Sequence, residues 1–265
     1  MEFEKTTPSS RLKSMLNVDF KRLVLSPITY IMAGACLVIP ILMLVMTQMM
    51  DGMVSVDPQT GMETVMKGFE SAFQALSQTT EASKTMDMSI TGMCNINMIY
   101  FIMAVFVCVF ISSEFRSGYA KNLFTNRAKK TEYVVSKTIV CTLTCMAYVL
   151  IFFIGILIGG KIAGLPFDLM GASVMQAIMC LITKVALCMV FVPIFIVACV
   201  FAKQRTWLSI IMSLCIGMLF FTMIPIISPL DTNILNLIMS IVGGGGIAIG
   251  LGAVSNLILK KTNII

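Results

Sequence analysis

Three groups of residues in this chain have types and spacing that can do chemistry. The first is Gly155-x4-Gly160-Lys161, which matches the start of a phosphate-binding loop, where backbone amides and a lysine hold phosphates. Such a loop needs Ser or Thr next, but Ile162 follows, and the glycines lie in an apolar run. Small residues four positions apart instead favour close helix packing in a membrane. These pairs are Gly155 with Gly159, Gly160 with Gly164, and Gly246 with Gly250. We therefore expect no nucleotide site on this chain.

The second group is a single cation. Lys184 lies inside the apolar run 171–202. If a membrane span begins near Gly171, Lys184 is near its middle and is a candidate to line a substrate path. If residues 185–202 alone cross a thin bilayer, Lys184 lies at the outer interface and its ammonium reaches water. Both alternatives stay open, and we favour the second.

The third group is the polar segment SSEFRSGYAKNLFTNRAKK, residues 112–130. Ser113 can cap a new helix, and Glu114 suits the first turn of one. Apolar residues recur at i, i+4 and i+8 with basic residues beside them: Phe115, Tyr119 and Leu123, with Arg116 and Lys121. This spacing predicts a short amphipathic helix over 114–125. Its apolar stripe must lie against lipid, the protein's own helices or another protein.

The composition excludes several classes of enzyme and identifies the protein class. The chain has no histidine, which excludes histidine-based catalysis and histidine metal ligation. Its nine cysteines lie almost entirely in apolar stretches and are expected to be packing residues. Hydrophobic residues make up 58% of the chain and charged residues 12%, far below the roughly 25% charged of a soluble domain. The chain is therefore expected to be an integral membrane protein and not itself an enzyme.

Runs without charges locate the elements that must position these residues. A span needs about 20 apolar residues, and a charge at the bilayer centre costs several kcal/mol. We expect an all-α integral membrane protein with six transmembrane helices, over residues 27–49, 92–113, 138–160, 173–202, 206–227 and 234–259.

Basic residues predict the orientation because they favour cytoplasmic loops. They cluster before the first expected span, after the second, after the fourth and at the chain end. Both termini are thus expected in the cytoplasm. The net charge of +6 is spread over loops that flank the membrane, which does not favour nucleic-acid binding.

Two further segments are predicted outside the spans. Residues 11–25 alternate apolar and basic faces at helical spacing, which predicts an interfacial amphipathic helix. Residues 51–91 form an outer loop in which Met62, Val65, Met66, Phe69, Phe73 and Leu76 keep helical spacing. We expect a helix there. Its Met/Phe face either packs on the spans or outer leaflet, which we favour, or contacts an exported substrate.

The segment after the second span resembles the permease subunits of type-2 ATP-binding-cassette exporters. In that family this loop carries a Glu, a Gly four residues on, hydrophobic positions, a basic residue in a turn and a Lys at the next span. The matching residues here are Glu114, Gly118, Leu123, Arg127 and Lys137. The chain departs from the pattern with Tyr119 where Thr is common and Asn126 where Pro is usual. The expected six spans and amphipathic helix extend the resemblance over nearly the whole chain.

The resemblance implies a coupling helix over 114–125 that contacts a separate ATPase subunit. The implied contact residues are Glu114, Phe115, Arg116, Gly118, Tyr119, Lys121, Leu123 and Arg127. ATP and magnesium would bind that subunit and not this chain. A second permease, identical or related, is implied, in a cell membrane that we expect to be bacterial. The path would carry a hydrophobic or amphipathic substrate, with peptides favoured over lipids and drugs. The alternatives are a membrane scaffold or sensor that binds lipid or a partner, and a secondary transporter.

Overall fold

Long apolar helices make up most of the described chain. The computed structural model describes residues 8–56, 63–80, 92, 94–125, 129–202, 205–221 and 224–261. Within these ranges five helices are long and apolar enough to cross a membrane. They are α2 (Pro27–Met49), α5 (Ile99–Arg116, extended by the 3-10 turn Ile96–Met98), α7 (Lys130–Ile162), α8 (Val174–Ala202) and α11 (Ile234–Lys261). A further apolar helix, α9 (Thr206–Phe221), has 16 residues. The prediction of an all-α membrane protein is confirmed.

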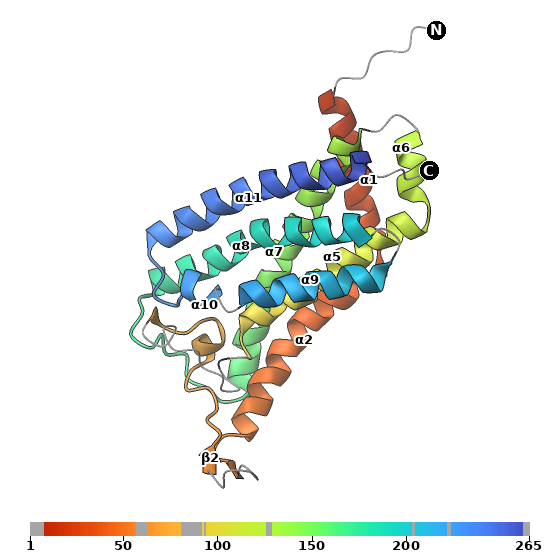
Figure 1. Cartoon of the computed structure of the whole chain (residues 1–265). Helices are drawn as coiled ribbons and strands as arrows, with labels where there is room; N and C mark the ends of the chain where they lie inside the picture. Colours follow the sequence, from red (N-terminus) through yellow and green to blue (C-terminus); the bar gives the residue numbers. More distant parts are fainter. Residues whose placement is uncertain are drawn as a thin grey trace, which may run out of the picture.

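The helices share one bundle with two different ends. Helices α5, α7 and α8 are largely buried and form its interior, whereas α2 and α11 lie outside and expose apolar side chains. Figure 1 shows α1 (Pro8–Leu25), α6 (Tyr119–Thr125) and the last turn of α11 together at one end, called here the α6 end. The predicted interfacial helix over 11–25 corresponds to α1. At about 1.5 Å per residue, the 33-residue α7 spans about 50 Å, so it extends beyond a hydrocarbon core about 30 Å thick.

The opposite end contains a compact loop structure instead of the expected outer helix. Strands β1 (Val54–Val56) and β2 (Glu63–Val65) pair antiparallel, and Ala72–Ala75 form a single 3-10 turn. The helix predicted from the spacing of Val65 to Leu76 is absent from that described stretch, and Met62 lies outside the described residues. The apolar side chains pack on the protein itself, as we favoured: Phe69 and Leu76 are buried, and the Phe73 ring contacts Phe167 edge-on. These side chains are therefore buried by tertiary packing of the loop and not along one face of a helix.

Glycines let α7 and α2 approach closely. A Cβ built on Gly155 would lie 2.5 Å from Pro40 Cγ and 2.7 Å from the Leu37 carbonyl oxygen, and one on Gly159 would lie 2.8 Å from Ile41 Cα. The expected small-residue packing is therefore confirmed for this pair. Gly160 packs on Ala72 of the loop, whereas Gly164, Gly246 and Gly250 have no described atom within 4 Å of a built Cβ. For the last three, the packing prediction finds no support among the described residues of this chain.

Replacing Gly155 with alanine is expected to force α2 and α7 apart. The new methyl group meets backbone as well as side-chain atoms, so the helices cannot relax by a rotamer change alone. Overpacking of this kind costs about 1–3 kcal/mol. The matched control is Gly250→Ala on α11, where the space is open and alanine is the better helix former. Thermal unfolding in mild detergent should show a lower midpoint for Gly155→Ala only, and equal midpoints would contradict the packing.

Candidate functional site

The polar segment at the α6 end folds as two helices joined at a glycine. Helix α5 continues through Glu114 to Arg116, and the short helix α6 begins at Tyr119. Glu114 therefore lies in the last turn of α5, and the prediction that it begins a new helix was wrong. Gly118 forms the corner with φ of 74°, a left-handed conformation in which a Cβ is unfavourable. Glycine at this position lets α6 turn away from the spanning helix.

Glu114 is the centre of a buried network of charges. Its side chain is fully buried, and Oε1 accepts from Lys137 Nζ at 2.5 Å and from Arg22 Nη1 at 2.6 Å. The Tyr133 hydroxyl donates to Oε2 at 2.8 Å. Both carboxylate oxygens are therefore satisfied by groups of the chain itself. The network joins α1, α5 and the first two turns of α7.

Asp19 completes the network from α1. Lys137 Nζ donates to its Oδ1 at 2.6 Å, and the Ser136 hydroxyl donates to its Oδ2 at 2.6 Å. Asp19 and Lys137 are each 1% exposed. Two carboxylates and two cations thus balance, in a group that we call the α6-end cluster: Asp19, Arg22, Glu114 and Lys137. Buried charges are tolerated only when they are paired and hydrogen-bonded in this way.

Our reading of the sequence missed Asp19. The residue lies on α1 four positions after Met15 and four before Leu23, on the face that packs against the bundle. An acid within the apolar stripe of an amphipathic helix signals a buried partner. That signal was present in the sequence, but the partner, Lys137, is more than one hundred residues away. Only the fold brings the two together.

Helix α6 is fixed to the cluster through aromatic side chains. The Arg22 guanidinium lies 4.1 Å above the ring centroid of Tyr119. The Tyr133 ring contacts Phe124 of α6 edge-on at 5.3 Å and Phe115 at 6.2 Å. These contacts join α6 to α1 and α7, and Tyr133 joins α7 to the last turn of α5.

The expected ATPase-contact residues divide into an inner and an outer set. Glu114 and Phe115 are buried, Gly118, Tyr119 and Leu123 are partly exposed, and Arg116 and Lys121 are exposed. Arg127 lies outside the described residues. The exposed cations can meet another chain directly. Glu114 and Phe115 can act on such a chain only by holding α6 in place, so we treat them as positioning residues.

Lys184 lies at the other end of the bundle and does not snorkel. Its side chain is 1% exposed, and Nζ donates to Asn97 Oδ1 at 2.9 Å and Ser228 Oγ at 3.0 Å. The Tyr100 hydroxyl donates to the Lys184 carbonyl oxygen at 3.0 Å. This arrangement differs from the interface position that we favoured. The lysine braces α8 against the start of α5 and the residue after α10 (Ile224–Ile227).

Lys184→Met is expected to change the free energy of unfolding by about 1 kcal/mol or less. Removing a buried cation whose described hydrogen-bond acceptors are neutral relieves a desolvation cost, which offsets the two lost hydrogen bonds. The measurement is unfolding by sodium dodecyl sulfate in mixed micelles. A loss of several kcal/mol would show that the ammonium is a major stabilising charge. If the lysine also contacts substrate, transport falls while stability is retained.

The remaining sequence candidates do not form a reaction centre. Gly155, Gly160 and Lys161 lie within or at the end of helix α7, where the glycines face other parts of the protein and not a phosphate. Over the ranges the structure covers, no three Cys, Asp or Glu side chains gather as metal ligands. The α6-end cluster itself is charge-balanced, and three of its four side chains are buried. Its geometry is suited to transmitting force between helices.

One comparison with known proteins identifies a family. A family model described as ABC-2 family transporter protein matches residues 15–220, well over half of the chain. The match includes the whole α6-end cluster, Lys184 and the helices α2 to α9. Neither the curated proteins nor the solved structures yielded a match. Multiple apolar helices and this match lead to one conclusion: the chain belongs to the ABC-2 family of transporter proteins, as a membrane-spanning permease subunit.

Proposed function

We propose that this permease is the membrane half of an ATP-driven exporter and that a separate ATPase subunit contacts it at α6. The observation that carries the proposal is the attachment of α6. This seven-residue helix is joined to α5 by one glycine corner and held to α1 and α7 by Arg22 of the α6-end cluster and by the Tyr133 ring. Its exposed side chains, by contrast, are polar and available to a partner.

The proposed mechanism follows from this attachment. When two ATPases close around ATP, a partner seated on Arg116 and Lys121 displaces α6. The Arg22–Tyr119 contact and the Tyr133 ring transmit the displacement to α1 and α7, and the Gly118 corner transmits it to α5. Coupled packing elements of this kind move as rigid bodies between discrete states. The spans then reorient and change access to a path between this permease and a second, identical or related one.

The proposed orientation places α6 and both termini in the cytoplasm. Support comes from the basic residues at the α6 end, which include Arg116, Lys121, Lys129 and Lys130 on or beside α6 and Lys260 and Lys261 at the end of α11. Lys130 Nζ also donates to the Leu259 carbonyl at 2.6 Å, which links α7 to the end of α11.

The proposed cargo is hydrophobic or amphipathic. The outer faces of α2, α8 and α11 present Leu, Ile, Val and Met, and the charges of the α6-end cluster are fully paired. Such surfaces suit apolar ligands with few polar groups. Within this class we favour amphipathic peptides over lipids and drugs.

Purification from the native membrane tests the proposal. The protein is extracted in mild detergent after brief crosslinking, its companions are identified by mass spectrometry, and ATP hydrolysis is assayed. The proposal predicts a stoichiometric ATPase subunit and ATP hydrolysis by the preparation. A chain recovered alone, without hydrolysis, would instead support a scaffold, a sensor or a secondary transporter.

A further inference from the structure

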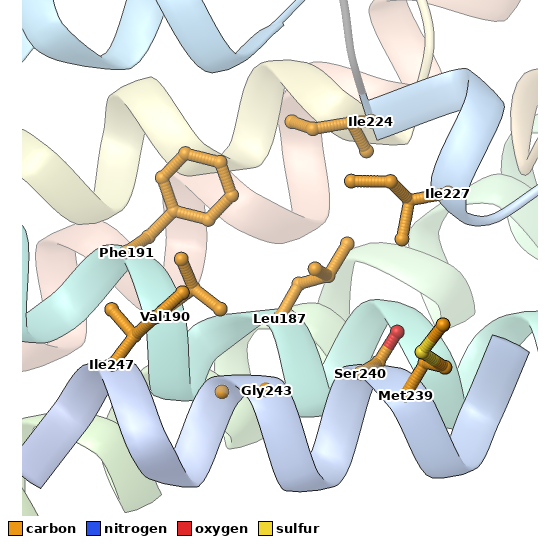
Figure 2. A pocket seen from close by; sticks show the side chains of 10 residues that line it. Leu187, Val190, Phe191, Ile224, Ile227, Met239, Ser240, Gly243 and Ile247 are labelled. Carbon is orange, nitrogen blue, oxygen red and sulfur yellow. The ribbon is translucent and has the colours of Figure 1, made fainter.

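A cavity of about 300 Å³ lies between α8, α10 and α11. Figure 2 shows its walls: Leu187 and Phe191 come from α8, Ile224 and Ile227 from α10, and Ser240 and Gly243 from α11. None of the described residues that line it is charged. Its volume is at the lower end of the range for ligand sites, roughly 300–1,000 Å³. The cavity can therefore accept an uncharged, mainly apolar ligand of modest size.

The cavity opens on the outer surface of the bundle. Met239 and Ile247 of α11 and Ile227 of α10 line it and are themselves exposed, with 68%, 42% and 41% of their surface accessible. These residues lie on or beside a helix long and apolar enough to span the membrane. In a bilayer, such an opening faces hydrocarbon and not water. A ligand can thus enter sideways from the membrane.

One polar group in the cavity has no partner among the described residues. The Ser240 hydroxyl oxygen is buried without a hydrogen bond, and Figure 2 shows it directed from α11 toward the space beside Leu187 and Ile227. Other hydroxyls in spanning helices donate to the carbonyl four residues earlier, as those of Thr47, Thr144 and Thr183 do at 2.8 Å. A buried hydroxyl without a partner costs about 1–3 kcal/mol. Ser255 shares this feature but is not among the cavity residues.

The walls of the cavity are held by the buried polar groups around Lys184. The Ser228 hydroxyl accepts from Lys184 and donates to the Ile224 carbonyl at 3.0 Å, which fixes α10. The Tyr100 ring stacks on Phe191, with centroids 4.4 Å apart. The walls that α8 and α10 supply are therefore held in place by contacts of their own.

We propose that this cavity binds an aliphatic chain carrying one uncharged hydrogen-bonding group, such as an alcohol, ester or amide, which pairs with the Ser240 hydroxyl. The chain contacts Leu187, Phe191, Ile224 and Ile227. Either a membrane lipid or the exported cargo can supply this chemistry. Binding itself requires only the membrane location, whereas the assignment to cargo rests on the proposed export function.

Photolabelling tests the site directly. The protein is reconstituted in phosphatidylcholine nanodiscs, without ATP or ATPase, and irradiated with hexadecanol carrying a mid-chain diazirine. Peptides are then mapped by mass spectrometry. We expect labels concentrated on the cavity residues of α8 and α11. Labels spread evenly over the exposed faces of α2, α8 and α11 would overturn the site.

A pair of glycine variants isolates the cavity. Gly243 lines it, and a Cβ built there meets no described atom within 4 Å, so Gly243→Leu fills the space without a clash at the Cβ. Gly245 lies two residues along the same helix, also has open space, and is not among the cavity residues. Gly243→Leu should abolish the concentrated labelling, and Gly245→Leu should leave it unchanged. Equal labelling in both variants would contradict the proposal.

The hydroxyl is tested by pairing a variant with a second probe. Ser240→Ala should lower labelling by hexadecanol at subsaturating concentration about fivefold, as expected for one lost hydrogen bond. Labelling by the matching hexadecane diazirine should not fall. This comparison keeps its meaning if Gly243→Leu fails to fold, because Ser240→Ala removes only one oxygen. If Ser240→Ala lowers labelling by both probes equally, or lowers labelling by neither, the role of Ser240 is overturned.

Native vesicles that contain the ATPase partner distinguish the two sources. If the occupant is cargo, ATP should deplete the hexadecanol label from the cavity. If the occupant is a bilayer lipid, ATP should leave the label unchanged. Either result follows a positive nanodisc experiment and supports the site. A failure of the proposed export function therefore alters the source of the ligand and leaves the binding result intact.

Discussion

Replacing Lys137 with methionine is expected to destabilise the protein by about 3–5 kcal/mol, the usual effect of removing one partner from a buried ionic group. Lys137 donates to both Asp19 and Glu114, which are fully shielded from solvent. Its loss leaves two buried carboxylates and only Arg22 to balance them. Unfolding by sodium dodecyl sulfate in mixed micelles measures the change. Lys121→Met, at an exposed position of α6, is the control and should have little effect.

A second substitution should restore much of this loss. In Asp19→Asn/Lys137→Met, the carboxylate that had lost its partner is neutral, and Glu114 keeps Arg22 and Tyr133. The cluster is then charge-balanced again. We expect the double variant to be more stable than Lys137→Met, which is unusual for an added substitution in a buried site. A double variant less stable than the single one would refute the assignment of Asp19 to the cluster.

Reversing the two exposed charges beside α6 is expected to weaken association with the ATPase subunit about a hundredfold. Arg116 and Lys121 are exposed in a segment whose other faces pack on the bundle. Their reversal to Glu places like charges opposite a surface complementary to cations, which costs several kcal/mol. The affinity is measured by titrating purified ATPase subunit onto the permease in nanodiscs. The thermal unfolding midpoint should stay the same, because neither side chain is part of the α6-end cluster.

A control with the same change in net charge distinguishes loss of a specific contact at α6 from a general effect of net charge on binding. Lys67 and Lys161 are exposed at the opposite end of the bundle. Lys67→Glu/Lys161→Glu should bind the ATPase as well as the wild-type chain does. Arg116→Lys/Lys121→Arg keeps the charges and should also bind. If both reversed pairs weaken binding equally, the contact is not at α6.

The spanning helices were predictable because their signal is local. A charge in hydrocarbon is costly whatever fold the rest of the chain adopts. Runs without charges therefore indicated α2 at residues 27–49 and α11 over most of its length. Some helices extend past the expected spans, at points where tertiary contacts compensate for polar residues. Helix α7 begins at Lys130, eight residues before the expected start, because Lys137 finds two carboxylates. Helix α5 extends past Glu114 for the same reason.

The candidate site was only half predictable. The spacing of Phe115, Tyr119 and Leu123 predicted one amphipathic helix over 114–125, of which only Tyr119–Thr125 forms the separate helix α6. The corner at Gly118 was not predicted. Lys137 pairs with Glu114, 23 residues away along the chain, and with Asp19, 118 residues away, and no local pattern encodes either pairing. The prediction for the loop at the opposite end failed for a different reason. Its Phe and Met spacing imitates a helix, but packing of Phe69 and Leu76 on the protein provides the burial.

Site-specific crosslinking from α6 tests the central claim most directly. A photoreactive amino acid replaces Lys121 in one variant and Lys67 in the other, and native vesicles are irradiated with and without ATP. We predict that position 121 crosslinks to the ATPase subunit, that position 67 does not, and that ATP changes the yield at 121. An ATPase that crosslinks at neither position, or equally at both, would contradict the assignment of α6 as the element that couples ATP hydrolysis to transport.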